Sequence, residues 1–151
     1  MKVVFLLGSE SDKSFADKIL EKLAPWGVEN EVIVASAHKV PEKVLEIVQK
    51  NNESEKNLVY ITIAGRSNGL SGVTAANSIH PVIACPPFKD KEDFMININS
   101  TLVMPSDTPV LTVLDPGNAA AAAVRMLAIA DDGLRAKVVG RIAEIKKSFE
   151  K

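Results

Sequence analysis

The sequence predicts an α/β fold: a three-layer, doubly wound parallel sheet of about five strands in the flavodoxin-like order. Short apolar runs alternate along the chain with longer segments whose apolar residues recur every three or four positions. The apolar runs contain few polar residues, as expected for strands that are buried on both faces. Strands that alternate with helices form parallel sheets with right-handed crossovers, and five such strands most often adopt the flavodoxin-like order.

The strands are predicted from these apolar runs, the first of which is Val-Val-Phe-Leu-Leu near the N-terminus. Each run is four to seven residues long, and glycine, proline or polar residues bound it. The predicted strands cover residues 3–7, 31–35, 58–64, 81–84 and 109–113.

The helices are predicted from helical spacing of apolar residues and from residue types that begin helices. Asp12 is expected to cap the first helix, and Pro41 opens the second. A more polar extra helix is expected at the C-terminus. The predicted helices carry residues 15–23, begin at residue 41, pass through 73–77, span 118–130 and run from about 132 to the end.

Two segments stand out between these elements. Residues 86–109 form the longest irregular connection, and connections of that length tend to be functional or to contain a short helix. The run Ala119 to Ala123 lets its helix pack very closely against a neighbour. That neighbour is either the sheet or a second subunit, and the sequence leaves both alternatives open.

Length, composition and charge narrow the function classes. A chain of 151 residues with 46% hydrophobic residues suits one domain, residues 1–151. The 18 basic and 19 acidic residues give a net charge of −1, which argues against a nucleic-acid or membrane-surface partner. The single cysteine, Cys85, excludes an internal disulfide and fits a reducing cytoplasm. Apolar runs stay well below the roughly 18 residues of a membrane span.

Small and polar residues follow the strands at their carboxyl ends. In open α/β sheets, ligands bind in the crevice outside these ends. All the connections there open on the same edge of the sheet, so we expect one ligand site. Its candidate residues are Gly8, Ser9, Ser11 and Asp12 after the first strand, Ser36, Ala37, His38 and Lys39 after the second, and Gly65, Arg66 and Ser67 after the third.

Each candidate has a structural and a functional interpretation. The Gly-Ser-Glu-Ser-Asp turn matches no standard nucleotide motif; it is either a capped turn or a cradle in which backbone N–H groups hold a phosphate or ribose. His38 taken alone is more often structural, but its place at a strand end beside Lys39 favours proton transfer. His80 precedes a strand on the opposite edge and is expected to be structural, and Cys85 is expected to be a packed small residue.

These stretches together resemble the phosphoribosylaminoimidazole carboxylases of purine biosynthesis, over nearly the whole chain. The matching stretches are GSESD near the start, SAHK after the second strand, AGRSNGLSG after the third, ACPP after the fourth, and a late MP…PV…NAA pattern. The family has two classes. Class I is a mutase with a longer glycine-rich loop that carries a histidine. Class II carboxylates aminoimidazole ribonucleotide with free carbon dioxide, and this chain resembles class II at Lys39, Arg66, Ser67 and Asn68.

The resemblance implies a role for each candidate residue. Ser9, Ser11 and Asp12 would hold the ribose and phosphate, and His38 would be the general base, with Ser36 and Lys39 beside it. The third loop would close over the base and carboxylate; its residues are Gly65, Arg66, Ser67, Leu70 and Ser71. The resemblance implies no biotin, metal or ATP. It also implies a free-standing carboxylase and a homo-oligomer, an octamer.

Two positions depart from the class II pattern. Val103 stands where relatives usually have Arg, and Asp107 stands where they have Gly. Alternatives therefore remain: a class I mutase, or a non-catalytic ligand-binding or signalling module on the same fold. A receiver domain would need phosphate-accepting carboxylates at the strand ends, and a cobalamin module would need Asp-x-His-x-x-Gly. The stretches 34–38 and 63–65 supply neither.

Overall fold

The structure, a computed structural model, describes residues 1–150 and contains an all-parallel five-stranded sheet between helices. The strands are β1 (Lys2–Leu7), β2 (Glu29–Val34), β3 (Leu58–Ile63), β4 (Val82–Ala84) and β5 (Val110–Thr112). The α-helices are α1 (Lys13–Leu23), α2 (Pro41–Ser54), α3 (Gly69–Asn77), α4 (Lys91–Asn97), α5 (Asn99–Leu102), α6 (Pro116–Leu127) and α7 (Asp132–Ser148), and two short 3₁₀ turns are η1 (Glu10–Asp12) and η2 (Ala24–Trp26).

The strand order is β2-β1-β3-β4-β5, with every neighbouring pair parallel, which confirms the predicted flavodoxin-like arrangement. The chain leaves β1 for one edge of the sheet, at β2, and returns to the other side of β1 at β3. This reversal makes a crevice at the carboxyl ends of β1, β2 and β3, the place where ligands bind in sheets of this kind.

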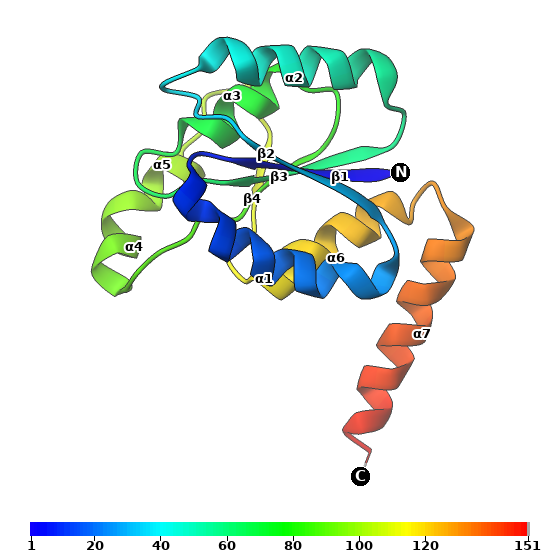
Figure 1. Ribbon diagram of the computed structural model, residues 1–151. Coiled ribbons are helices and arrows are strands. Elements are labelled where there is room, and N and C mark those ends of the chain that lie inside the picture. Colours follow the sequence, from blue (N-terminus) through cyan, green and yellow to red (C-terminus); the bar gives the residue numbers. More distant parts are fainter. Residues whose placement is uncertain (151) are drawn as a thin grey trace.

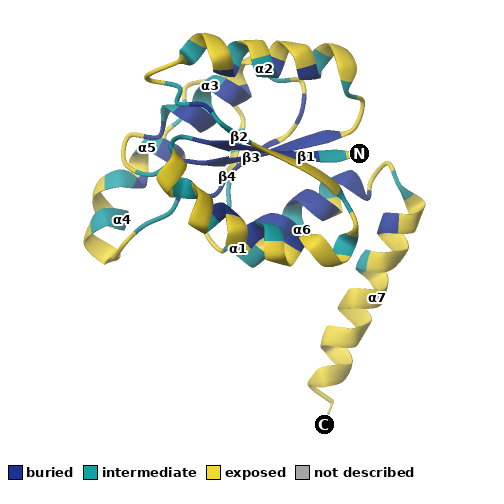
Figure 2. Ribbon diagram, viewed as in Figure 1, coloured by how far each residue is buried: buried dark blue, intermediate teal, exposed yellow. Residues whose placement is uncertain are grey.

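Alternate residues of β1 feed two hydrophobic cores, one on each face of the sheet. Val3, Phe5 and Leu7 pack with α1 and α6, whereas Val4 and Leu6 pack with α2 and α3. Figure 1 shows α2 and α3 above the sheet and α1 and α6 below it, and Figure 2 shows that both helix pairs turn buried residues toward the strands. This burial on both faces explains the continuous apolar runs of β1, β3 and β4. The edge strands β2 and β5 were also expected to be buried on both faces, but their residues are exposed or only partly buried, because each edge strand has a neighbour on one side only.

The alanine run of α6 lies mainly in the core. Ala119, Ala120 and Ala123 are fully buried among α1 and the sheet. These three small side chains therefore permit close packing within the chain, against α1 and the sheet. This is the first of the two alternatives; the other was contact with a second subunit. The helix begins at Pro116, two residues earlier than predicted, because the Asp115 carboxylate caps it by accepting from the Asn118 N–H at 2.8 Å.

The long connection 86–109 contains two short helices, α4 and α5, which confirms that it conceals helical structure. Asp90 begins α4 by accepting from the Asp93 N–H at 2.9 Å. The extra C-terminal helix is also present. Its N-terminal half packs on the body of the molecule through Leu134 and Val138, and residues 139–148 project from it and are exposed (Figures 1 and 2). Among residues 1–150, no helix is long and apolar enough to cross a membrane.

Candidate active site

A cleft of about 710 Å³ opens at the carboxyl edge of the sheet, where the strand order reverses. The loops after β1, β2, β3 and β4 and the start of α4 form its walls. Its lining residues are Gly8, Ser9, Ser11, Asp12, Ser36, Ala37, His38, Lys39, Ala64, Gly65, Arg66, Ser67, Gly69, Leu70, Pro87, Phe88, Lys89 and Asp93. The structure thus brings all the predicted site residues except Ser71 to one cavity.

The first wall is the loop between β1 and α1. Asp12 occupies the N-cap position of α1, as predicted, but its side chain makes no capping bond to that helix. Its carboxylate instead turns back and accepts from the Ser9 N–H at 2.9 Å and the Ser9 hydroxyl at 3.1 Å. The reason is the η1 turn, in which Asp12 ends one short helix just before α1 begins. Burial raises the pKa of the Asp12 carboxyl, and the two bonds from Ser9 oppose that rise. The hydroxyls of Ser9 and Ser11 lie 2.6 Å apart at the cleft.

His38 belongs to the turn that connects β2 to α2. This turn is held by bonds from the Val40 N–H to the Ser36 carbonyl, at 2.9 Å, and from the Lys39 N–H to the Ser36 hydroxyl, at 3.3 Å. The His38 imidazole extends across the cleft to the start of α3. Its Nε2 atom lies only 3.0 Å from the position that a Cβ atom would take on Gly69. The absence of a side chain at Gly69 therefore permits this close approach.

Arg66 lies in the loop between β3 and α3 with a left-handed backbone, at φ 52°. Non-glycine residues adopt this region uncommonly and at an energetic cost. Two residues later, Asn68 is almost completely buried, and its side chain caps α3 by accepting from the Ser71 N–H at 3.3 Å. The loop that carries Arg66 to the cleft is thus anchored in the protein on its far side.

Ser71 is the predicted site residue that does not reach the cleft. It is fully buried in the first turn of α3, and it is absent from the cavity lining. Its backbone N–H donates to the capping Asn68 side chain at 3.3 Å, whereas the neighbouring Leu70 does line the cleft. Within residues 1–150 the Ser71 hydroxyl has no hydrogen-bond partner. The resemblance implied that Ser71 contacts the ligand, but in this structure its side chain is buried away from the cleft.

Three lining residues were not predicted from the sequence: Phe88, Lys89 and Asp93 form the wall nearest α4. The Asp93 carboxylate holds this wall by accepting from the Lys89 N–H at 3.0 Å and from the Asn97 side chain at 2.8 Å. Phe88 packs edge-on against Phe94, with ring centres 5.1 Å apart. The signal for this wall was present, because the Asp90–Asp93 spacing indicates a helix start in the connection after the fourth strand.

The charges around the cleft favour an anionic ligand. Its two carboxylates, Asp12 and Asp93, already accept hydrogen bonds from the protein. The side chains of Lys39, Arg66 and Lys89 form no ion pair with any other residue of the described chain. Within residues 1–150, no three His, Cys, Asp or Glu side chains gather closely enough to hold a metal ion.

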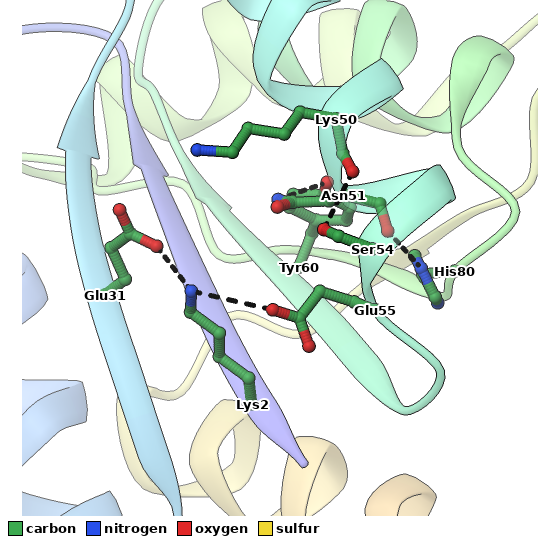
Figure 3. A network of polar contacts seen from close by, with 8 residues as sticks. All are labelled: Lys2, Glu31, Lys50, Asn51, Ser54, Glu55, Tyr60 and His80. Carbon is green, nitrogen blue, oxygen red and sulfur yellow. Dashed lines mark hydrogen bonds and ion pairs between the residues drawn. The ribbon is translucent and has the colours of Figure 1, made fainter.

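The remaining histidine lies elsewhere, as predicted. His80 is buried at the opposite edge of the sheet, where its Nε2 atom lies 3.4 Å from the Asn51 carbonyl oxygen and the Asn51 side chain donates to the Tyr60 hydroxyl at 2.9 Å (Figure 3). Cys85 is fully buried, and burial together with the Asp115 charge raises the pKa of its thiol to about 12. The interpretation of Cys85 as a packed residue is confirmed.

The fold and the cleft define an α/β protein with a flavodoxin-like sheet and a candidate small-molecule site at its carboxyl edge. The model of the AIR carboxylase family matches residues 2–148. The chain belongs to this family, whose members are enzymes of purine biosynthesis. The predicted family is therefore confirmed.

Named relatives show how far this similarity extends. The chain is 45% identical to a phosphoribosylaminoimidazole carboxylase of Archaeoglobus fulgidus over 139 residues, which cover 92% of this chain and 76% of that protein. The crystal structure of Treponema denticola PurE superposes with a TM-score of 0.90 at 35% identity, and the match covers 98% of this chain and 93% of that one.

Two further relatives differ in their printed functions. The chain is 42% identical to an N5-carboxyaminoimidazole ribonucleotide mutase of Methanocaldococcus jannaschii, over 96% of this chain and 90% of that protein. It is 37% identical to a bifunctional phosphoribosylaminoimidazole carboxylase and succinocarboxamide synthetase of Drosophila melanogaster, of which it spans only 35%. Relatives of both reaction types are thus similar to this chain, and their names do not distinguish carboxylase from mutase.

Proposed function

We propose that this protein carboxylates 5-aminoimidazole ribonucleotide with carbon dioxide, giving 4-carboxy-5-aminoimidazole ribonucleotide. Family membership supports the substrate class. The observation that carries the proposal is a cleft that is lined by one histidine and by three cationic side chains that have no ion-pair partner in residues 1–150. A ribonucleotide phosphate and a new carboxylate are the anions that this reaction brings to such a cleft.

The substrate itself supplies the nucleophile. The ring carbon at position 4 is enamine-like, so its electron pair attacks the carbon of carbon dioxide. One C–O π pair moves onto oxygen to give the carboxylate, and the ring becomes cationic while it still holds its proton at that carbon. Removal of the proton returns the C–H electron pair to the ring and restores its aromaticity. The protein must therefore supply a base and an environment that stabilises the carboxylate.

His38 is the proposed base. Imidazole accepts and releases protons near neutral pH, which suits a step that runs in either direction. The imidazole reaches over the start of α3 at Gly69, between the loops after β2 and β3. A substrate ring that lies between these two loops would present its reacting carbon to this imidazole.

Arg66 is proposed to stabilise the carboxylate, and the loop Gly8 to Asp12 to bind the ribose and phosphate. A guanidinium offers five donors and stays charged throughout the reaction. Ser9 and Ser11 place two hydroxyls at the other end of the cleft, close to the η1 turn. Lys39 and Lys89 add positive charge at the rim, where they would attract the phosphate.

A mutase on the same cleft is the second candidate. It would transfer the carboxyl group from the ring-substituent nitrogen to the ring carbon. The Methanocaldococcus jannaschii relative, which carries the mutase name and is 42% identical, is the observation that favours it. The Arg66, Ser67 and Asn68 loop, together with Lys39, is the feature that favours the carboxylase.

Supplying each substrate separately distinguishes these functions. Incubation with aminoimidazole ribonucleotide and bicarbonate, without ATP, should yield the carboxylated product at a rate that rises with bicarbonate. Enzyme-dependent conversion of the N-carboxy isomer, faster than its spontaneous decarboxylation and insensitive to bicarbonate, would instead establish the mutase. If neither reaction occurs, the remaining alternative is that the protein is a non-catalytic ligand-binding module.

We also propose that the chain forms a homo-oligomer, an octamer. Helix α7 carries Val139, Ile142 and Ile145 on its exposed length, and Phe149 is exposed directly after it. Leu111 and Leu114 are exposed at the β5 edge. Burying such apolar surface against another subunit removes it from water. Light scattering at micromolar concentration should give a mass well above that of one 16.2 kDa chain, and a mass near that value would overturn the proposal.

A further inference from the structure

Helix α5 holds the loop that carries Arg66 from the side opposite the cleft. The Ser100 hydroxyl donates to the Arg66 carbonyl at 2.7 Å and accepts from the Asn68 N–H at 2.9 Å. One hydroxyl therefore bridges two backbone groups that stand two residues apart in the loop. Ser100 itself is absent from the cavity lining, so any effect of this residue on a ligand must pass through the loop.

The next residue of α5 completes the attachment. The Asn68 side chain donates to the Thr101 hydroxyl at 3.0 Å, and both residues are almost completely buried. Asn68 also accepts from the Ser71 N–H, so it joins the loop to α3 as well as to α5. The loop is consequently held at Asn68 by bonds of its side chain. At Arg66, the bond from the Ser100 hydroxyl is the only hydrogen bond to the backbone that is found within residues 1–150.

The fastening coincides with an unfavourable backbone conformation. Arg66 has φ 52°, a region that costs a non-glycine residue free energy relative to the ordinary regions. Such a conformation persists only where the surroundings determine it. The bonds that Ser100 makes fix the carbonyl of Arg66 itself and the amide of Asn68, so they hold the chain directly after the left-handed residue.

We propose that Ser100 is a positioning residue for Arg66: its hydroxyl stabilises the left-handed turn and thereby directs the guanidinium toward the cleft. This inference rests on the proposed function only for the role of Arg66 in catalysis, since the hydrogen bonds stand without it. The hydroxyl is also 2.8 Å from the Asn97 carbonyl, the ordinary acceptor one helical turn earlier. The shorter contact, at 2.7 Å, is the one to Arg66.

The physical part of the proposal is tested by hydrogen exchange in the intact protein. Ser100→Ala should speed exchange of the peptides that cover residues 64–72 by roughly tenfold, because the Asn68 N–H loses its acceptor. Ser54→Ala is the matched control, since it removes one hydroxyl-to-carbonyl bond of the same kind, to Lys50, from the far end of α2. Unchanged exchange in Ser100→Ala would overturn the proposal.

The catalytic part is tested by a double-mutant cycle. Ser100→Ala alone should lower kcat/KM by about tenfold at an unchanged melting temperature, and mostly through kcat if the guanidinium acts on the developing carboxylate. In the Arg66→Ala background the same change should have little further effect, because residues that act as a unit are not additive. Ser54→Ala should leave kcat/KM unchanged.

The outcomes separate the two proposals. Additive losses from Ser100→Ala and Arg66→Ala would show that Ser100 acts by another route and would overturn the positioning role. If the wild-type protein converts neither aminoimidazole ribonucleotide nor its N-carboxy isomer, the proposed function fails, and the exchange experiment still decides whether Ser100 holds the turn.

Discussion

The Nε2 atom of His38 lies 3.0 Å from the position that a Cβ atom would take on Gly69. A contact of this length is tighter than nine in ten real Cβ contacts, so a side chain at this position would require the imidazole to shift by a few tenths of an ångström. The two residues stand 31 positions apart in the sequence, on loops after different strands. Their contact joins the proposed base to the loop that carries Arg66.

Gly69→Ala should therefore displace the imidazole without unfolding the protein. The alanine favours the helix that begins at this position, so the melting temperature should hold or rise. Turnover should fall on the order of 10–100-fold, since small misplacements of a reacting group cost that much. Gly140→Ala on α7 is the control, because an added Cβ meets nothing within 4 Å there; equal turnover in both variants would contradict the prediction.

His38→Asn should keep the fold and abolish turnover. The side chain is exposed in the cleft, so its loss removes no buried contact from the core. Asparagine hydrogen-bonds but does not accept a proton at neutral pH, which removes the base. Circular dichroism and thermal denaturation check the fold. Retention of more than a few per cent of the rate would show that another group takes the proton.

Arg66→Ala should raise the barrier of the reaction by about 2–4 kcal/mol, the magnitude of losing one oxyanion donor. The loss should appear in kcat, because the carboxylate forms only during the reaction. Arg141→Ala removes a comparable charge from an exposed pair with Glu144 on α7, and such pairs contribute little. If the two variants lost similar amounts of kcat, the effect of Arg66 would be that of any surface charge, and the prediction would be wrong.

Asp12 should make the protein less stable as the pH rises. Its folded pKa is raised above the ordinary value of 3.8, so the folded state binds the proton more tightly than the unfolded state does. The stabilisation by the bound proton is fully present below pH 3.8, and it is lost as the pH rises through the raised pKa of folded Asp12. Urea unfolding of wild type and Asp12→Asn should therefore show the variant gaining relative stability over this interval. A difference that stays constant with pH would contradict this.

The Cys85 thiol should be unreactive in the folded protein. It is fully buried, and its pKa of about 12 leaves almost no thiolate at pH 8. A thiol-specific chromogenic reagent should modify it only after denaturant is added, when one thiol per chain becomes accessible. Modification of the native protein at the rate of a free cysteine would mean that the β4 end opens readily.

The sequence by itself determined the sheet and the edge at which the candidate site lies. Short apolar runs identify the strands, and the residues after those runs must meet at one edge of a parallel sheet. From these patterns His38 and Arg66 were predicted to lie at that edge, and both line the cleft. The sequence could not give the direction of the Ser71 side chain, because its burial follows from the cap that Asn68 makes on α3.

The tertiary structure alone decided the contacts between loops that are distant in the sequence. The approach of His38 to Gly69, the bridge from Ser100 to Arg66 and the wall formed by Phe88, Lys89 and Asp93 each depend on how the segments pack. A hydrophobic pattern predicts which face of a helix or strand is buried. It does not predict which residue of another element packs against that face, so these contacts could not be predicted from the sequence. The turn of the Asp12 side chain back onto Ser9 was likewise not evident from the sequence, because Asp12 also ends the η1 turn and its carboxylate forms a capping box with Ser9 there.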